Sequence, residues 1–210
     1  MMGVYFVIAV IAYLIGSINF SVIISQKMAG FDVREKGSGN AGSTNVLRTV
    51  GKKAAIITLI CDVLKGVISI LLAKLISVIW TELNGALLVQ LAGIFAIIGH
   101  TFPIFFKFKG GKGVATSLGV LLTTNWQIGL ICLVFALVLM ALTQMVSVGS
   151  IVAAILYPVL TIFITQNYII PGNYVISSII LAVLVVFNHR SNVKRIMTGT
   201  ENKISFKTVK

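Results

Sequence analysis

One stretch of the sequence, residues 114–187, contains no Asp, Glu, Lys or Arg. A helix needs about 20 mostly apolar residues to cross the hydrocarbon core of a bilayer. In the whole chain, charged residues make up only 10% and the mean hydropathy is +1.04. A soluble domain of this size has no core large enough to bury so much apolar surface. We therefore predict an all-α integral membrane protein, with residues 1–210 forming a single domain and the polar segments forming its loops.

Polar and turn-forming residues divide the apolar sequence into segments of helix length. The long uncharged run is interrupted at residues 123–127 (TTNWQ), 143–149 (TQMVSVG) and 166–173 (QNYIIPGN). The predicted segments are 2–25, 54–80, 86–102, 114–122, 128–142, 150–165 and 174–187. Segment 114–122 covers only about 14 Å at 1.5 Å per residue. We expect it to be a half-helix buried against other helices, where broken backbone is tolerated at membrane depth.

Lysine and arginine concentrate in residues 26–53, in residues 107–113 and in the tail after Asn188, whereas residues 81–85 carry Glu82 and no basic residue. Basic loops favour the cytoplasmic side of a membrane. This pattern places the N-terminus outside and the C-terminus inside, which requires an odd number of crossings. We predict about seven transmembrane helices, some of them short or broken. Five full spans, with two segments re-entrant or peripheral, is the alternative.

The net charge of +12 arises from 17 Lys and Arg against 5 Asp and Glu. The positive-inside bias explains most of this excess in a membrane protein, so we expect no nucleic-acid partner. Binding of anionic substrates is compatible with the same excess. The two cysteines and two histidines are scattered, without the spacing of a metal site. We therefore expect no metal and no cofactor.

The first polar loop contains the motif KGSGNAGSTNVLR at residues 36–48. Gly37 and Gly39 let backbone approach a ligand closely, and Arg48 suits bidentate contact with a phosphate. A solvated linker is the alternative, although Gly/Ser linkers rarely carry so much Asn, Thr and Arg. No Walker A pattern is present. The neutral side chains that can donate or accept hydrogen bonds here are Ser38, Asn40, Thr44 and Asn45.

The second motif, GHTFPIFFKFKGGKGVAT, spans residues 99–116. Successive glycine amides can form a concave anion site, and a helix starting at Val114 would direct its N-terminus toward the same anion. A basic turn of the positive-inside kind is the alternative. The residues that favour anion binding are Lys107, Lys109, Gly110, Gly111, Lys112 and Gly113.

A third motif, FNHRSNVKRIMTGTENK, follows the last apolar segment at residues 187–203. His189 is the ionisable side chain of this motif whose residue type, histidine, has an unperturbed pKa suited to proton transfer near neutrality, and Asn192 leaves the same span. Glu201 is expected to pair with a basic neighbour rather than to do chemistry. Within the apolar segments, Asp62 and Lys65 are three residues apart and share a helical face. A structural ion pair in the protein interior and a ligand contact both fit them.

Four strings of the sequence together resemble the acyl-phosphate-dependent glycerol-3-phosphate acyltransferases of bacterial inner membranes. They are GSGNAGSTNVLR, DVLKG, GHTFPIFFKFKGGKGVAT and HRSNVKRIMTGTEN. The four strings occur in the family's order between residues 37 and 202. One departure is Asn19, where the family pattern has proline after Gly-Ser-Ile. This departure affects the local bend of the first span.

The resemblance implies transfer of an acyl chain from acyl phosphate to the sn-1 hydroxyl of glycerol 3-phosphate, giving lysophosphatidic acid and phosphate, the first acylation of bacterial phospholipid synthesis. It implies that Ser38, Arg48, His189 and Asn192 act in catalysis, that the second motif binds glycerol 3-phosphate, and that Glu201 is structural. It also implies a multi-pass protein of the inner membrane with a cytoplasmic active site, whose partners are glycerol 3-phosphate, acyl phosphate and membrane lipid. The sequence leaves the oligomeric state open.

A transporter of a phosphorylated metabolite is the competing class of function. Basic loops and broken helices suit a transporter, but the polar residues cluster on one side of the predicted bilayer. The signatures of two other enzyme classes are absent. Neither His100 nor His189 begins an H-x-x-x-x-D motif, and Asp32 and Asp62 are the only aspartates, too few for a CDP-alcohol phosphotransferase.

Overall fold

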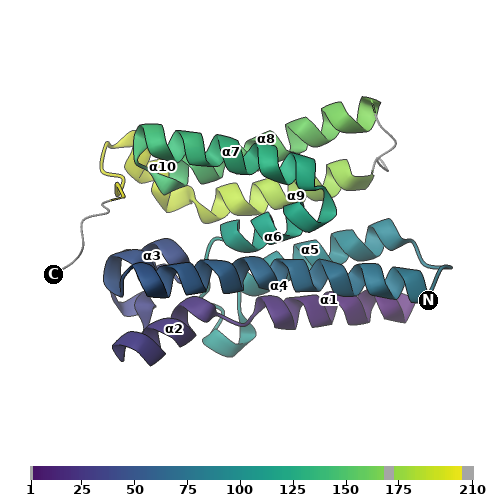
Figure 1. Cartoon of the computed structure of the whole chain (residues 1–210), viewed down its shortest axis with the longest axis horizontal. Coiled ribbons are helices and arrows are strands. Elements are labelled where there is room, and N and C mark those ends of the chain that lie inside the picture. Colours follow the sequence, from purple (N-terminus) through teal and green to yellow (C-terminus); the bar gives the residue numbers. More distant parts are fainter. Residues whose placement is uncertain (1, 168–172, 205–210) are drawn as a thin grey trace. The chain divides into compact units, whose positions relative to one another are not determined.

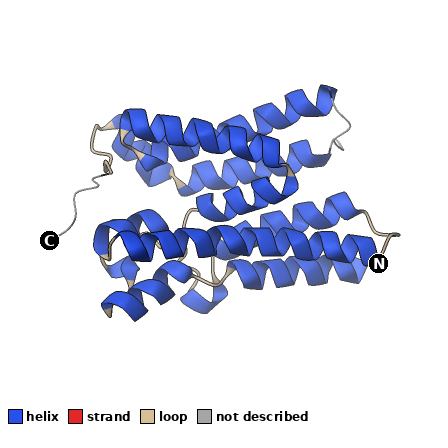
Figure 2. Cartoon of the chain, viewed as in Figure 1, coloured by secondary structure: helices blue, strands red, loops and turns tan. Residues whose placement is uncertain are grey.

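A computed structural model describes residues 2–167 and 173–204, and every regular element in those residues is a helix (Figures 1 and 2). This confirms the predicted all-α membrane protein. Five of the described helical segments are long and apolar enough to cross a membrane, and a sixth is added if one bent pair counts as a span. The alternative of five full spans therefore agrees better with helix length and composition than seven does. Part of the predicted break at residues 166–173 lies outside the described residues.

The chain forms two helical units, divided between Thr123 and Thr124. In the first unit, α1 (Met2–Gly16), α4 (Lys52–Ile79) and α5 (Gly85–Thr101) pack against one another. Small residues allow the close approach, since a Cβ added at Gly16 would meet the backbone of Ala96, and one at Gly99 would meet the carbonyl oxygen of Tyr13. Close packing through small residues is typical of helices in membranes.

The first predicted span is broken in its second half. Between α1 and α2 (Phe20–Ala29), the chain leaves the helical conformation at residues 17–19. The side chain of Asn19 caps α2 by accepting a hydrogen bond from Val22 N at 3.3 Å. Asparagine is a favoured residue at this position, so Asn19 begins a new helix at the place where the family pattern has proline.

Short elements follow in the polar loop and after α5. They are η1 (Val33–Glu35), α3 (Ser43–Thr49), η2 (Ile104–Phe106) and α6 (Val114–Thr124). α6 is an apolar helix too short to span the bilayer, as predicted for the half-helix. It packs closely on α4, because a Cβ at Gly119 would meet the carbonyl of Val63 and one at Gly66 would meet the carbonyl of Thr116.

The second unit contains α7 (Trp126–Thr143), α8 (Val146–Asn167), α9 (Asn173–Asn188) and α10 (Arg190–Met197). α8 packs against α7 and α9. Asn125 caps α7 by accepting from Ile128 N at 3.1 Å, so the predicted break at residues 123–127 ends one helix and starts the next. α10 bends away from α9 by 58° at His189, which places the third motif at the end of the last apolar helix.

Candidate functional site

The first polar loop is organised around the buried side chain of Asn45, which is 1% exposed. Its amide donates to the carbonyl oxygens of Val33 and Lys36 at 2.9 and 3.0 Å, and its Oδ1 accepts from the backbone N–H of Ser38 at 2.9 Å. Asn45 was predicted to bind substrate. In the structure Asn45 shapes the loop, because both amide hydrogens and the carbonyl oxygen have backbone partners.

The loop presents its other predicted residues at the surface of the first unit. Ser38 is exposed, and the hydrogen bond from its backbone to Asn45 fixes its position. Gly37 and Gly39 adopt left-handed backbone conformations with φ of 61° and 70°, which glycine accepts without steric cost. Arg48 is half-buried in the last turn of α3.

The second motif forms a tight turn after α5. Lys107 and Phe108 have φ of 58° and 57°, which is rare for residues with a Cβ. Lys107 and Lys109 are exposed, and Lys112 is half-buried. The turn therefore presents the positive charges of Lys107 and Lys109 at the surface of the first unit.

The glycine pair in this motif binds the end of α5. The N–H of Gly110 donates to the Thr101 carbonyl and that of Gly111 to the His100 carbonyl, both at 3.1 Å. These two amides are therefore not available for the predicted concave anion site. The glycines have a packing role as well, because a Cβ at Gly111 would meet His100 Nε2 and the carbonyl oxygen of Ala41.

Replacing Gly111 with alanine should lower the stability of the protein and its activity together. The added methyl group collides with a backbone carbonyl that cannot rotate away, and overpacking of this kind costs about 1–3 kcal/mol. The measurement is thermal unfolding in detergent. Gly3→Ala is the matched control, because nothing lies within 4 Å of a Cβ at Gly3. Equal melting temperatures for the two variants would contradict the close packing at Gly111.

Helix α6 starts directly after the glycine-rich turn, as the sequence predicted. Gly113, with φ of 86°, precedes its first residue. The hydroxyl oxygens of Thr116 and Ser117 are buried in the first turn and have no hydrogen-bond partner among the described residues. Together with the backbone N–H groups of a helix start, they make this end of α6 suited to a polar or anionic ligand.

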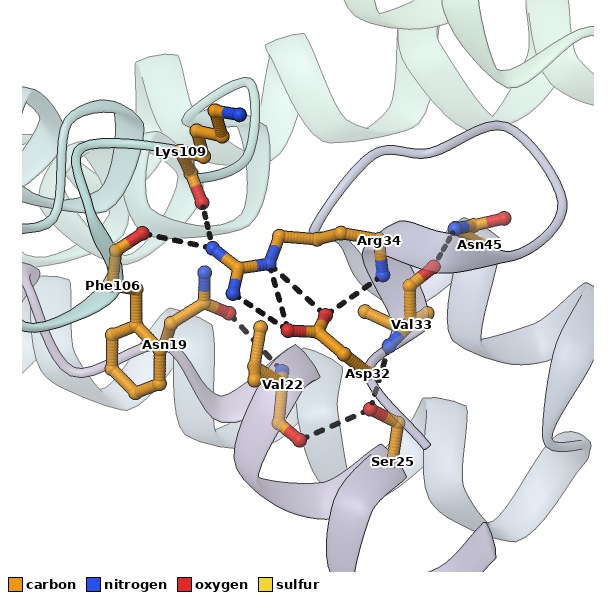
Figure 3. A network of polar contacts seen from close by, with 9 residues as sticks. All are labelled: Asn19, Val22, Ser25, Asp32, Val33, Arg34, Asn45, Phe106 and Lys109. Atoms are coloured by element: carbon orange, nitrogen blue, oxygen red, sulfur yellow. Dashed lines mark hydrogen bonds and ion pairs between the residues drawn. The ribbon is translucent and has the colours of Figure 1, made fainter. Parts of the chain in front are cut away.

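The two glycine-rich loops are joined by Arg34, which lies outside the three sequence motifs (Figure 3). Its Nη1 donates to the carbonyl oxygens of Phe106 and Lys109 at 2.8 and 3.0 Å. Its Nε and Nη2 donate to the carboxylate of Asp32 at 2.6–3.1 Å. The hydrogen bond from Arg34 lowers the pKa of Asp32, so this carboxyl stays ionised at physiological pH.

Asp62 and Lys65 form a buried ion pair in α4, with the Lys65 Nζ 2.9 Å from Asp62 Oδ1. Their side chains are 2% and 3% exposed. Lys65 also donates to the Ile18 carbonyl at the break in the first span, at 2.9 Å. His100 Nδ1 lies 3.5 Å from the same Asp62 oxygen. The pair therefore faces the protein interior, as predicted, and contacts both α5 and the chain between α1 and α2.

In the second unit, His189 lies at the bend between α9 and α10 and is 2% exposed. Its Nδ1 is 2.8 Å from the Val185 carbonyl oxygen. Because a carbonyl only accepts, the neutral imidazole carries its proton on Nδ1, and Nε2 is the nitrogen that can accept a proton.

Glu201 fastens the tail to two helices of the second unit. Its Oε1 accepts from Ser147 Oγ at 2.9 Å and from Asn192 Nδ2 at 2.7 Å, and its Oε2 accepts from Arg195 Nε at 2.9 Å. Burial raises the pKa of Glu201, but the hydrogen bonds from Asn192, Ser147 and Arg195 outweigh it and lower the pKa overall. Glu201 pairs with Arg195, as expected, and it also orients Asn192.

Glu201→Gln is expected to lower the free energy of unfolding by about 1.5–3 kcal/mol, because hydrogen bonds to a charged group are lost. The folded-state pKa lies below the ordinary value of 4.5. The contribution is therefore complete above that ordinary value and is lost as the pH falls through the lowered pKa. Melting temperatures of wild type and variant should differ at pH 7 and converge in acid. Glu82→Gln, in an exposed loop, is the control. A difference in melting temperature that does not change with pH would contradict a stabilising role for the charge of Glu201.

The predicted residues thus fall into two groups, one in each unit. The first unit brings the loop with Ser38 and Arg48 next to the turn with Lys107 and Lys109. The second unit holds His189 and Asn192 together at the start of α10. Within the described ranges, no group of three or more His, Cys, Asp and Glu is placed to hold a metal ion.

The fold and these loops define a multi-pass integral membrane protein with basic, glycine-rich sites suited to phosphate groups. The family model described as glycerol-3-phosphate acyltransferase matches residues 6–199. The chain belongs to this glycerol-3-phosphate acyltransferase family, and it is an acyltransferase.

Relatives and solved structures agree with this assignment over nearly the whole chain. A glycerol-3-phosphate acyltransferase of Clostridioides difficile is 43% identical over 97% of both chains. One from a Thermoanaerobacter species is 45% identical over 95% of this chain and 96% of the relative. The crystal structure of PlsY, an integral membrane glycerol 3-phosphate acyltransferase, in its glycerol 3-phosphate form has a TM-score of 0.83 at 35% identity, covering 96% of each chain. Its lysophosphatidic acid form gives 0.81 at 33% identity, covering 96% of this chain and 95% of that one.

Proposed function

We propose that this protein transfers an acyl group from acyl phosphate to the sn-1 hydroxyl of glycerol 3-phosphate, giving lysophosphatidic acid and inorganic phosphate. The reaction takes place at the cytoplasmic face of the bacterial inner membrane and begins phospholipid synthesis. The observation that supports it best is the contact between two basic, glycine-rich loops in a membrane-embedded helical unit. Both substrates bring a phosphate, and each loop supplies cations and glycines for one.

Cations and hydrogen-bond donors at the two loops bind the phosphates. Lys107, Lys109 and Lys112 provide point charges beside the start of α6, where helix N–H groups favour an anion. Arg48 offers a planar donor for bidentate contact with phosphate oxygens. The remaining predicted contacts are with the glycine backbones and side chains around Ser38 and with the residue before α6: Gly37, Gly39, Asn40, Thr44 and Gly113. Gly110 and Gly111 shape the site through their hydrogen bonds to the end of α5.

The reaction needs no covalent enzyme intermediate. The glycerol hydroxyl oxygen attacks the acyl carbonyl carbon, the bond from that carbon to the phosphate oxygen breaks, and phosphate departs with the electron pair. Phosphate is a good leaving group in this mixed anhydride, so the protein has to position the reactants and stabilise negative charge. Ser38 lies beside the cations of the first loop and donates a hydrogen bond to the reacting oxygens.

His189 and Asn192 act in the same reaction from the second unit. Two roles fit His189: Nε2 removes the proton of the attacking hydroxyl, or it accepts a hydrogen bond that orients the hydroxyl. Asn192, fixed by Glu201, donates to a substrate oxygen. Burial of both residues limits their rotation, which suits groups that position a substrate.

The membrane arrangement that accompanies this proposal is the one predicted from charge. The three basic segments lie in the cytoplasm, the N-terminus lies outside and the C-terminus inside. The chain works as one acyltransferase domain. A cysteine introduced at Lys36, which is exposed in the first loop, should react with a membrane-impermeant thiol reagent only in inverted vesicles.

Phosphate release by the purified protein in lipid tests the reaction. Palmitoyl phosphate is supplied with and without glycerol 3-phosphate, and the lipid product is analysed. Release that depends on glycerol 3-phosphate, gives lysophosphatidic acid and fails with acyl-CoA establishes the proposed activity. Folded protein that binds glycerol 3-phosphate and gives no product would overturn it and favour a transporter, which labelled uptake into vesicles would then detect.

A further inference from the structure

The guanidinium group of Arg34 connects the two proposed substrate loops of the first unit. Arg34 lies in η1, before the first motif, yet its Nη1 reaches carbonyl oxygens 72 and 75 residues further along the chain. Figure 3 shows Nη1 directed at Phe106 and Lys109, while Nε and Nη2 face the carboxylate of Asp32. The side chains of Arg34 and Asp32 are 22% and 14% exposed.

The donors of Arg34 are used almost completely inside the protein. A guanidinium has five N–H groups. Nε and one Nη2 hydrogen serve Asp32, and both Nη1 hydrogens serve the two carbonyls. Arg34 is therefore poorly suited to bind a substrate phosphate directly. Asp32 also accepts from the Arg34 backbone N–H at 2.9 Å, which holds carboxylate and guanidinium in one orientation.

The two carbonyls that Arg34 binds stand on either side of a strained turn. Lys107 and Phe108, between them, are the residues with φ of 58° and 57°. L-residues keep such conformations only where the surroundings enforce them. The turn has internal bonds from Phe108 N to Pro103 O and from Lys109 N to Phe106 O, the second long at 3.3 Å. The bonds from Arg34 clamp the turn from outside, at its entry and its exit.

Asn45 connects this clamp to the first motif. It donates to the carbonyl of Val33, the residue before Arg34, and it holds the backbone of Ser38. One continuous set of hydrogen bonds therefore runs from Ser38 through Asn45 and η1 to the turn with Lys107 and Lys109. A shift of Arg34 would change the distance between the two loops.

We propose that Arg34, oriented by Asp32, is a positioning residue that fixes the lysine turn of residues 106–109 relative to the Ser38 loop, so that glycerol 3-phosphate and acyl phosphate bind in register. This inference rests on the proposed function of the two loops. Arg34 acts through backbone carbonyls and touches no substrate. Its contribution is the geometry of other cations, where misplacement by about 1 Å costs on the order of 100-fold in rate.

The first variants are Arg34→Met and Arg34→Lys, tested by steady-state kinetics in lipid. We expect kcat/KM for glycerol 3-phosphate to fall by about 10- to 100-fold in both, mainly through KM. Lysine keeps the charge, but a single ammonium cannot serve the carboxylate and two carbonyls in the same geometry. Lys27→Met removes one exposed positive charge from the same unit and should keep wild-type kinetics. Wild-type kinetics in both Arg34 variants would overturn the proposal.

Asp32→Asn is the second variant and keeps the size of the side chain. It should raise KM in the same direction, because the guanidinium loses its ionic partner. The double variant Asp32→Asn with Arg34→Met should have the same KM as Arg34→Met alone, since both changes remove the same interaction. Additive losses would contradict a shared role.

Hydrogen–deuterium exchange provides a readout that does not depend on turnover. In Arg34→Met, the amides of Phe108 and Lys109 should exchange faster, while those of α4 stay unchanged. This result supports the clamp even if the protein proves to transport glycerol 3-phosphate rather than acylate it. Unchanged exchange in the turn, or faster exchange throughout the unit, would overturn the proposal. An inactive wild-type protein with a protected turn would instead count against the proposed function alone.

Discussion

Replacing His189 with glutamine is expected to lower kcat by about 100- to 10,000-fold, the range that general acid–base catalysis contributes. The Nδ1 of His189 donates to the Val185 carbonyl at 2.8 Å, which fixes the ring and directs the basic nitrogen, Nε2, away from that carbonyl. A glutamine amide can form a hydrogen bond near the Nε2 position but cannot take up a proton near neutral pH. The measurement is kcat across pH 5–9 with saturating acyl phosphate.

His189→Asn is the companion to this variant. Asparagine keeps a donor near the Nδ1 position for the Val185 carbonyl and has nothing at the Nε2 position. If His189 is the base, both variants lose turnover to the same extent, and the acidic limb of the wild-type pH profile disappears. If it orients the hydroxyl, glutamine keeps near-normal turnover across pH and asparagine does not. Melting temperatures close to wild type would show that the losses are chemical.

The sequence predicted the all-α membrane fold because the length of an apolar segment is a local property of a chain. The half-helix predicted at residues 114–122 is found as α6. The spacing of three residues placed Asp62 and Lys65 on one helical face, and the structure shows them as an ion pair. Each of these features depends on residues close in sequence.

What the sequence did not predict depends on contacts between distant segments. Arg34 was counted among the basic residues of a cytoplasmic loop, and nothing near it indicates that its partners are the carbonyls of Phe106 and Lys109. The amides of Gly110 and Gly111 were expected to bind an anion, but they meet carbonyls at the end of α5. Buried backbone N–H and C=O groups need hydrogen-bond partners when a loop packs on a helix. One sequence does not show which distant groups those partners are.

The buried ion pair carries the largest expected effect on stability. Lys65→Met leaves the carboxylate of Asp62, 2% exposed, without its ion-pair partner, and His100 Nδ1 lies 3.5 Å from it. Breaking a buried pair by removing one partner costs about 3–5 kcal/mol, because the remaining charge loses its compensation. The melting temperature in detergent should fall accordingly. Lys74→Met, on the same helix but exposed and bonded to the Thr123 carbonyl, should change stability by less than about 0.5 kcal/mol.

The double variant Asp62→Leu with Lys65→Met separates the ion pair from its individual charges. Well-packed apolar residues often replace a buried pair at little cost, so the double variant should be more stable than Lys65→Met alone. Recovery should be incomplete, because Lys65 also satisfies the Ile18 carbonyl at the break between α1 and α2. Losses that add in the double variant would mean that the two charges are stabilised separately. Partial recovery would instead show that the pair is needed as a unit, with Lys65 joining α4 to the break in the first span.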